Sequence, residues 1–358
     1  MASVWKVDWE VSIDGTNLTS KWKPVLIDIE VTDKAGATSD ACSLTIDDTG
    51  GQIRLPREGQ RLIVKLQGRK VFEGFIEQPQ SSGSRGGGRV LKIKAKSANS
   101  AGKAKEPQNF HADDATLEEF LGDAAKRAGL KLTVDPSFAS IKRDYWSAEG
   151  ESFFALGERW ARRLGGTFKI RGDRAILARR GQTASPSGGE LASVVAIVGK
   201  NVISWDITPR DPRRTFKRGS AKWFDRATAE YKSTDLEFEG DDPGNADNVA
   251  RYIMADEDEA GEHLDARKRE SKREAGSGTV ELDLTVDAVA EGQMTIEKAR
   301  SGVNGTYRIE SVKHKANRSG GATTTLELKE PGGGAGKDGR KKGQAEPEFA
   351  LPRSETLG

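Results

Sequence analysis

The sequence predicts a mainly β fold with a small α/β insertion, and three observations lead to it. Runs in which apolar and polar residues alternate fill residues 1–108 and return in 181–330, as expected for strands with one buried face. Between them, residues 109–180 hold two stretches with helical spacing. Gly, Pro and Asp turns separate the runs, and Gly occurs 41 times in 358 residues. We therefore expect two antiparallel β domains, each a barrel or a sandwich, and an α/β module.

The first β domain, residues 1–108, contains six alternating runs. In the first run, Trp5, Val7, Trp9, Val11 and Ile13 share one face, and polar or charged residues share the other. Turns rich in Gly, Pro and Asp bound the remaining runs, which predicts short strands connected by tight turns. These runs occupy residues 25–31, 42–46, 61–66, 71–77 and 89–96.

The α/β module, residues 109–180, is predicted to contain two helices. The first lies in TLEEFLGDAAKRAGL, where Thr116 and Glu119 make a capping box and Gly129 ends the helix. The second lies in GESFFALGERWARRLGG and also ends at glycines. Short strands are expected after each helix, at 130–134 and between 167 and 178.

The second β domain, residues 181–330, starts with a linker, GQTASPSGG. Strand-like runs at 191–208 and 280–286 flank a highly charged helix, DEDEAGEHLDARKRESKREAG, whose apolar stripe is thin. Such a helix is expected to lie on a surface or to reach its partner through long Arg and Lys side chains. The strands TYRIESV and TTTLELK complete the domain, and residues 331–358 have the composition of a disordered tail.

The two β domains share a weak internal repeat. The segments FIEQPQSSGSRGGGRVLKIKAK and RIESVKHKANRSGGATTTLELK match at one constant offset along the chain. Both are expected to be hairpins with Gly-Gly near the tip, which favours a duplicated domain, although glycine-rich segments also match by chance. The matching pairs are Ile76 with Ile309, Gly87 with Gly320, Gly88 with Gly321, Ile93 with Leu326, and Ala95 with Leu328.

Composition limits the classes of partner and compartment. Lys and Arg number 57 against 55 Asp and Glu, so the net charge of +2 gives no general reason to expect a nucleic acid or membrane partner. No run of 18 apolar residues exists, and the charged start MASVWKVDWE lacks the apolar core of a signal peptide. One cysteine excludes an internal disulfide. We expect a protein made in a cytoplasm.

The stretch DACSLTIDDTGGQIRLPREGQ raises the question of a catalytic cysteine. Cys42 would need a neighbouring base, and none of the three histidines lies in a nucleophile setting. By alternation, Cys42 points into the core with Leu44 and Ile46, where a thiol acts as a small apolar group. Asp47 and Asp48 are interpreted as turn residues rather than as paired carboxylates.

Four further motifs also have a structural interpretation. The acids at 255–262 suit a helix N-terminus better than a calcium site. GSRGGGR at 83–89 lacks the features of a phosphate-binding loop and is interpreted as a hairpin tip. TPRDPRRTFKR at 208–218 is the most basic stretch, and we interpret it as a solvated or subunit-facing loop rather than as a nucleic-acid contact. His314 is expected to make a structural hydrogen bond. We therefore expect no catalytic, cofactor or metal-binding residues and no enzymatic activity.

Several stretches resemble the late control D family of phage tail proteins, the baseplate hub group that is similar to the N-terminal part of VgrG-type spike proteins. The stretches are SIDGTNLT, LIDIEVTDKAGATSDACSLTIDD, GGQIRLPREGQRLIVKLQG, VFEGFIE, EGESFFALGERWARRLGGTFKI and GTYRIESVKHKANRSGGATTTLEL. Each stretch by itself is a weak signal, because it consists of turns and strand alternation. The order and spacing of the stretches are fairly specific, and together they extend to about residue 330.

The resemblance implies two related antiparallel β-barrel domains with a small α/β insertion. It also implies a homotrimer, in which three chains with two barrels each form a pseudo-sixfold ring. Such a ring adapts the sixfold tail tube to the threefold central spike of a contractile phage tail or tail-like particle. The expected partners are the tail tube or its initiator, the spike and other baseplate proteins, with a lumen for DNA or the tape-measure protein. The expected location is the virion baseplate, after assembly in the host cytoplasm.

The chain departs from VgrG-type proteins at its end. It stops at PGGGAGKDGRKKGQAEPEFALPRSETLG instead of continuing into an OB-fold and needle, so we expect the spike to be a separate polypeptide. Within this tail, residues 331–358, Phe349 and Leu351 are candidate anchors for docking against a neighbouring baseplate protein.

Two alternative functions remain open. One is a tail-associated cell-wall hydrolase that uses acids such as Glu151, Glu158 or Asp173, since glycosidases need two carboxyl groups across a cleft. The other is a cell-wall or receptor-binding module, for which segment 112–180 would bind glycans.

Overall fold

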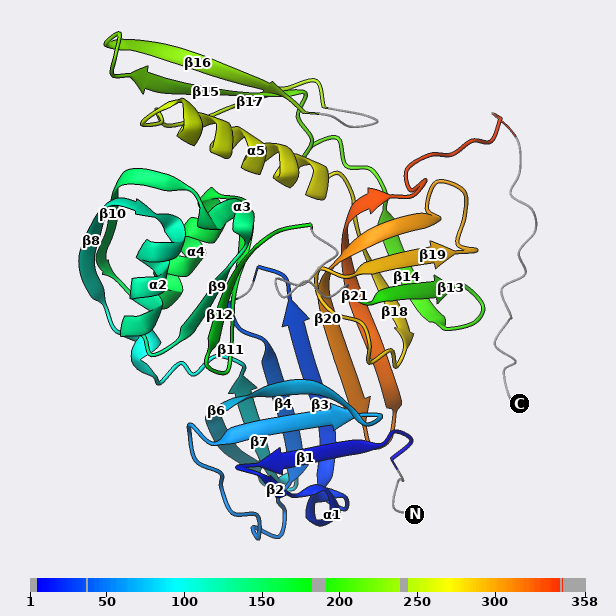
Figure 1. The fold of residues 1–358 in the computed structure, drawn as a ribbon. Coiled ribbons are helices and arrows are strands. Elements are labelled where there is room, and N and C mark those ends of the chain that lie inside the picture. The colour runs from blue at the N-terminus through cyan, green and yellow to red at the C-terminus, as the bar shows by residue number, and fades with distance from the viewer. Residues whose placement is uncertain (1–4, 37, 182–190, 239–243, 342, 344–358) are drawn as a thin grey trace. The chain divides into compact units, whose positions relative to one another are not determined.

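The computed structural model describes residues 5–36, 38–181, 191–238, 244–341 and 343, and the chain is mainly β (Figure 1). It divides into two compact units. The first unit comprises Met1–Glu190 and Val312–Thr324, and the second comprises Leu191–Ser311 and Thr325–Gly358. The strands β20 (Gly305–Asn317) and β21 (Gly321–Gly332) therefore contribute residues to both units.

The β region of the first unit is an antiparallel sheet in the order β3-β4-β7-β6-β5-β1-β2. Its predicted strands are confirmed. Their bounds are β1 (Trp9–Ile13), β2 (Thr16–Asn17), β3 (Leu26–Lys34), β4 (Ala41–Asp47), β5 (Arg61–Leu66), β6 (Arg69–Ser84) and β7 (Gly88–Lys96), with a short helix α1 (Thr19–Trp22) after β2. The residues that alternate inward, such as Val11, Ile29, Leu44, Val64 and Ile93, are all fully buried. Strand periodicity thus placed this core correctly.

The first strand is shorter than its alternating sequence suggests. The run begins at Trp5, but β1 begins at Trp9, where it pairs with Leu66, the last residue of β5. Because β5 ends there, residues before Trp9 have no strand to pair with in this sheet. Trp5 instead packs edge-on against the ring of Trp9, with 5.4 Å between ring centroids.

The α/β module in the first unit packs two helices against short strands. The helix α2 (Leu117–Arg127) has the predicted capping box: the Glu119 N–H donates to the Thr116 hydroxyl at 3.3 Å, and the Thr116 N–H donates to the Glu119 carboxylate at 2.8 Å. The helix α4 (Phe153–Arg163) is the second predicted helix. The remaining elements are η1 (Lys103–Lys105), β8 (Gln108–Thr116), β9 (Lys131–Val134), α3 (Pro136–Ala139), β10 (Lys142–Glu151), β11 (Gly166–Arg171) and β12 (Arg174–Arg179).

The module has a core of its own that is rich in aromatic side chains. Phe120, Trp146, Phe153, Trp160 and Phe168 are all buried, and the rings of Trp146 and Trp160 lie edge to face with centroids 4.7 Å apart. The antiparallel pair β8 and β10, which contributes Trp146, was not predicted. Its sequences carry many charged residues, so a two-stranded ribbon with one covered face gives only a weak alternation.

The second unit contains a sheet in which β14-β18-β21-β20 are neighbours and β19 pairs with both β13 and β20. The bounds are β13 (Ser193–Ile197), β14 (Val202–Thr208), β18 (Ser277–Asp283) and β19 (Gln293–Glu297). The strand runs predicted at 191–208 and 280–286 are confirmed, with β18 starting three residues earlier than expected. No closed barrel is found among the described residues, so barrel closure of the two β regions stays a prediction.

The charged helix is confirmed as α5 (Glu257–Arg273). Its thin apolar face, Ala260 and Leu264, packs on Ala221 and Trp223 of a separate three-stranded sheet that was not predicted. The strands of that sheet, in the order β16-β15-β17, are β15 (Arg218–Asp225), β16 (Glu230–Glu237) and β17 (Asp247–Val249).

The C-terminal end of α5 is held by ion pairs, as the predicted long Arg and Lys side chains suggested. The buried guanidinium of Arg273 lies 3.1 Å from a Glu291 oxygen, and its Nε donates to Glu310 at 3.0 Å. Burial alone would lower the pKa of Arg273, but the two carboxylates raise it overall. Next to it, Lys272 pairs with Glu330 at 3.3 Å.

The predicted internal repeat corresponds to two hairpins of the same construction. In the hairpins β6–β7 and β20–β21, the three-residue turns and the strand ends next to them lie at the same constant offset as the matching residues. The glycine after each turn, Gly88 or Gly321, has a positive φ of 74° or 87°, which a residue with a Cβ rarely adopts. The matching apolar residues, Ile76 with Ile309, Ile93 with Leu326 and Ala95 with Leu328, are all buried.

The predicted structural hydrogen bond of His314 is confirmed within the β20–β21 hairpin. Its Nδ1 lies 3.0 Å from the hydroxyl of Thr324, and both residues are buried. Burial lowers the pKa of His314 to about 4, because the cationic imidazolium would lose its hydration there. The charge of Asp33 opposes this shift to a small extent. The folded protein therefore holds a neutral imidazole.

This burial predicts a pH dependence of stability. Between pH 6.5 and pH 4 the unfolded chain binds a proton at His314 that the folded chain does not, so the free energy of unfolding falls as the pH falls through this range. Below about pH 4 the full loss is reached, about 3 kcal/mol. In His314→Gln this contribution should be missing, as measured by urea unfolding at pH 7 and at pH 4.

The control is His111→Gln, since the His111 side chain is 61% exposed. It should keep the pH dependence of the unsubstituted protein. If His314→Gln shows the same loss of stability between pH 7 and pH 4 as this control, the buried neutral histidine does not contribute in the way described.

Candidate functional site

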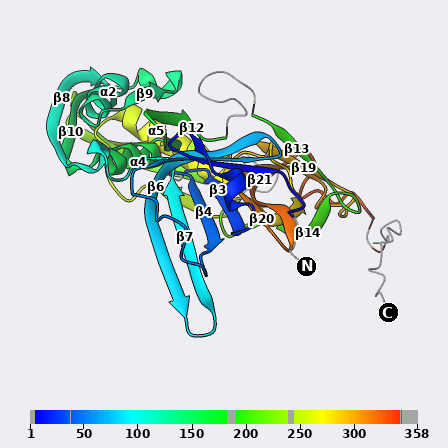
Figure 2. The same ribbon diagram turned by 90° about the horizontal axis from the view of Figure 1, so that it is seen from below.

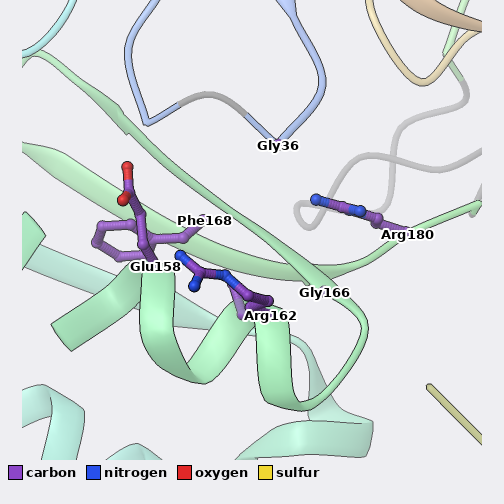
Figure 3. Close-up of a pocket in the computed structure, with 7 residues that line it drawn as sticks. Gly36, Glu158, Arg162, Gly166, Phe168 and Arg180 are labelled. Atoms are coloured by element: carbon purple, nitrogen blue, oxygen red, sulfur yellow. The ribbon is translucent and has the colours of Figure 1, made fainter. Parts of the chain in front are cut away.

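The candidate site is a cavity of about 170 Å³ in the first unit. It lies where the loop between β3 and β4 meets the helix α4 and the strand β11, and Figure 3 shows the side chains around it. The lining residues are Gly36, Glu158, Ala161, Arg162, Gly166, Phe168 and Arg180.

Local sequence explains how α4 presents this surface. The hydroxyl of Ser152 accepts a hydrogen bond from the Ala155 N–H at 3.2 Å, which caps the first turn of the helix. The helix buries Phe153 and Trp160, so Glu158 and Arg162, one turn apart, face away from the module core. At Gly157 a Cβ would lie 2.4 Å from the Phe168 ring, so glycine allows α4 to lie close to β11.

The charged groups that line the cavity are one carboxylate and two guanidinium groups. The Thr38 hydroxyl donates a hydrogen bond to the Glu158 carboxylate. In Figure 3, Glu158 and Arg162 project from α4, while Arg180 approaches from the side of Gly36. Gly36 has a φ of 71°, and a Cβ there would overlap the Arg180 guanidinium. This arrangement suits a tight junction between the β3–β4 loop and the module.

The three acids considered for a hydrolase are not gathered at this cavity. Only Glu158 lines it. Glu151 accepts a hydrogen bond from Arg159 at 2.6 Å, and Asp173 lies 3.7 Å from Lys131 at an exposed turn. A glycosidase needs a second carboxyl group across the cleft from the first. The lining of this cavity contains one carboxyl group, so it does not provide that pair.

Beside the cavity, a cluster of two acids and two bases connects the β3–β4 loop to β11. Lys169 forms ion pairs with Asp33 and, at 2.6 Å, with Asp40. Arg171 donates from Nε to Asp40 at 2.9 Å and lies 3.4 Å from Asp33. The side chain of Lys169 is only 13% exposed. We call these four residues the junction cluster.

Charge and burial act in opposite directions on the two acids of the junction cluster. Burial alone would raise the pKa of Asp33, but the charges of Lys169 and Arg171 lower it well below its usual range. For Asp40, burial and the neighbouring Asp33 carboxylate raise the pKa despite the same two cations. Two neighbouring carboxylates cannot both be stabilised equally in the ionised form, so Asp33 is the acid that loses its proton more readily.

Main-chain hydrogen bonds complete the junction. The Ile170 N–H donates to the Thr38 carbonyl at 2.8 Å, and the Gly172 N–H donates to the Ser97 carbonyl at 3.1 Å. The buried Ser97 hydroxyl accepts from the Asp40 N–H at 2.9 Å and donates to the Ile170 carbonyl at 2.8 Å. The module is therefore attached to the β region by backbone as well as by charge.

Cys42 lies in the core, as predicted. It pairs with Ala95 across β4 and β7 and is 3% exposed, and burial raises the pKa of its thiol far above the usual value. The turn interpretation of the two aspartates is also confirmed. Asp47 accepts from the Thr49 N–H at 3.0 Å and from its hydroxyl at 2.6 Å, and Asp48 accepts from the Ile53 N–H at 3.2 Å. These bonds to Thr49 lower the pKa of Asp47.

The acidic segment 255–262 forms the start of α5. Asp256 is its N-cap and accepts from the Glu259 N–H at 2.8 Å, and further acids occupy the first turn. In the part of the chain that the structure describes, no group of three His, Cys, Asp or Glu side chains is placed to hold a metal ion. The glycine-rich segment 83–89 is the connection between β6 and β7, as predicted for a hairpin tip.

The basic loop 208–218 is largely neutralised by acids of its own unit. Arg213 pairs with Asp211 at 2.8 Å, and Arg214 pairs with Glu274. Arg218 pairs with Asp247 at 2.6 Å. These pairs reduce the positive charge available for nucleic acid, and the interpretation as a solvated or subunit-facing loop stays a prediction. The docking residues Phe349 and Leu351 lie outside the described residues.

The junction cluster predicts a large effect of one substitution. Lys169→Met removes the least exposed cation and leaves the two carboxylates with Arg171 alone, which should destabilise the junction by about 3–5 kcal/mol. Hydrogen exchange at the Ile170 and Gly172 amides, which donate across the junction, should become faster. The control is Lys200→Met, an exposed lysine of the second unit. Equal exchange rates in both variants would show that the cluster does not hold the module.

One further finding concerns membranes. Of the helices within the described ranges, none is both long and apolar enough to span a bilayer.

Comparison with known proteins gives two curated relatives and a set of solved structures, whereas no family model matches the chain. The relatives are the probable baseplate hub proteins of Escherichia phages 186 and P2. They are 26% identical over 182 residues and 27% identical over 191 residues, respectively. These alignments cover 50% and 52% of this chain. The chain matches about half the length of each relative, 46% and 49%.

The similarity in fold extends over nearly the whole chain. A 43 kDa tail protein of prophage MuSo2 from Shewanella oneidensis has a TM-score of 0.66 at 15% identity, over 90% of this chain and 98% of that one. An E. coli component of the type VI secretion system, described as similar to the T4 tail proteins gp27 and gp5, has a TM-score of 0.58 at 10% identity, over 92% and 79%. The chain therefore has the fold of phage tail proteins, and the predicted resemblance to baseplate hub proteins is confirmed by homologues of that name.

Proposed function

We propose that this chain is the structural baseplate hub of a contractile phage tail or of a tail-like injection particle. The two homologues named as baseplate hub proteins support the proposal, and the tail-protein fold over some nine-tenths of the chain agrees with it. Its location would be the virion baseplate, after assembly in the host cytoplasm.

The observation that carries the mechanism is the pair of equivalent hairpins, β6–β7 and β20–β21. Their turns, turn glycines and matching buried residues correspond at one offset, which favours a duplicated β domain with boundaries near 1–108 and 181–330, separated by the module 109–180. Two related barrel-type domains per chain give six similar units in a homotrimer. Such a ring matches the sixfold tail tube on one side and a threefold spike on the other.

This mechanism is one of symmetry and force transmission rather than of chemistry. The hub would bind the tail tube or its initiator, a separate spike polypeptide and other baseplate proteins, and would leave a lumen for DNA or the tape-measure protein. No observation favours the alternatives of a cell-wall hydrolase or a wall-binding module, since the cavity lining contains one carboxyl group. An assay of peptidoglycan turnover and glycan binding by segment 112–180 would separate them.

The proposal predicts the mass of the assembled protein. Light scattering or native mass spectrometry should show a trimer of the 38.7 kDa chain, either for the purified chain alone or, with the added mass of the spike, for the mixture with its spike. A monomer that persists in the presence of the spike, and that cleaves peptidoglycan, would contradict the hub.

A second prediction concerns the tail, residues 331–358. Deleting residues 335–358, or changing Phe349 and Leu351 to Ala together, should leave the trimer intact and weaken recruitment of a neighbouring baseplate protein, as measured by co-purification of baseplate components. Comparing the double substitution with the deletion distinguishes the effect of the two apolar side chains from the effect of shortening the tail. Unchanged recruitment in both variants would reject the docking role.

A further inference from the structure

The segment from Gln78 to Lys105 is strongly basic although the whole chain is nearly neutral. It contains seven Lys and Arg residues and no Asp or Glu, within a protein whose net charge is +2. Most of it forms the distal part of β6, the turn and β7, and Figure 2 shows this hairpin extending beyond the ends of β3 and β4. The positive charge is therefore concentrated on one hairpin of the first unit.

Three lysines of this segment form a row on β7. Lys92, Lys94 and Lys96 are exposed, because Leu91, Ile93 and Ala95 alternate with them and are buried in the core. Side chains two residues apart on a strand are spaced by about 6.7 Å. We call these three residues the lysine row.

The neighbours of the lysine row are mostly neutral hydrogen-bonding side chains. On β4, Thr45 pairs with Lys92 and Ser43 pairs with Lys94. On β6, Gln80 pairs with Lys92 and Gln78 pairs with Lys94. Directly paired residues share a face of the sheet, so each of these two lysines lies between a hydroxyl and an amide.

Few acids of the protein itself compete for this charge. Among the described residues, Lys92 and Lys94 have no ion pair, and Lys96 has only Glu77 at 4.0 Å. The nearest acids on β3 already have partners, since Glu30 pairs with Lys313 at 2.9 Å and Asp28 lies 3.4 Å from the Asn317 amide. The lysine row thus differs from the loop 208–218, whose arginines are matched by acids.

We propose that the lysine row binds the phosphodiester backbone of double-stranded DNA without reading its sequence. Its spacing of about 6.7 Å is twice the rise of about 3.4 Å per phosphate of one strand, measured along the axis of B-DNA. Backbone binding requires cations and hydrogen-bond donors, which the row and its Ser, Thr and Gln neighbours supply. A protein interface is disfavoured, because its core requires apolar or aromatic anchors and is poor in lysine.

The choice of DNA as the polyanion rests on the proposed hub function, which brings DNA past this protein. The binding itself does not require a trimer. Affinity and particle mass are therefore measured on the same full-length sample. If the protein binds DNA but stays a monomer even when mixed with its spike, the hub is contradicted and the lysine row is supported. If it forms a trimer but does not bind DNA, the hub is supported and the lysine row is contradicted.

The test is the binding of a fluorescent 30-base-pair duplex, followed by anisotropy between 50 and 200 mM NaCl. The variant changes Lys92, Lys94 and Lys96 to Gln together. The unsubstituted protein should bind two duplexes of unrelated sequence equally, and the variant should bind about tenfold more weakly or worse at 50 mM NaCl. The slope of log affinity against log salt should become smaller by about 2.7, the value for three released counterions.

The matched control changes three exposed lysines of the second unit, Lys200, Lys217 and Lys222, to Gln, and so has the same net charge as the variant. It should keep the affinity of the unsubstituted protein. Equal weakening in both triple variants, or no binding by the unsubstituted protein at 50 mM NaCl, would overturn the proposal. Displacement of the duplex by polyglutamate at equal charge concentration would also overturn it, because an acidic protein surface would then serve as well as phosphate.

Discussion

The two-residue period of antiparallel strands is the constraint on which the rest of this structure depends. In the first β region, β4 and β7 pair so that Leu44 meets Ile93 and Cys42 meets Ala95 within the core. A slip of one residue would place Lys92 and Lys94 in that core and expose the apolar side chains, so burial holds the register firmly. The same register places the lysines in a row on the outer face. The buried apolar core and the exposed lysine row therefore both follow from the register of β4 and β7.

The equivalent hairpins extend this constraint to the second β region. Because Gly88 and Gly321 both take a positive φ directly after a three-residue turn, each hairpin reverses at the same place relative to its buried residues. His314 shows how a polar side chain is accommodated at a buried position of this hairpin. Its ring is kept neutral and meets the Thr324 hydroxyl, so the imidazole at this buried position carries no charge and has a hydrogen-bond partner.

The α/β module is attached by a different kind of interaction. Its aromatic core is its own, and its contact with the β region combines main-chain and hydroxyl hydrogen bonds with the junction cluster. A partly buried ion cluster contributes little net stability by itself, but removing any one of its charges lowers the free energy of unfolding, because an opposite charge is then left without its partner. It therefore favours one arrangement of the module on the β region over others.

The sequence by itself determined which faces of the strands are buried, where α2, α4 and α5 begin and end, and that Cys42, Asp47 and Asp48 are structural. These features depend on neighbours within a few residues, through periodicity, capping and turn geometry. It did not reveal the β8–β10 pair, the β15–β17 sheet or the junction cluster. Asp33 and Lys169 are 136 positions apart, and only the folded chain brings their charges together. Tertiary structure likewise decided which basic residues keep their charge free. Arg214 and Arg218 meet acids that are distant in the sequence, Glu274 and Asp247. The strand partners of Lys92 and Lys94 carry hydroxyl and amide side chains, because pairing across a sheet is set by the fold and not by proximity along the chain.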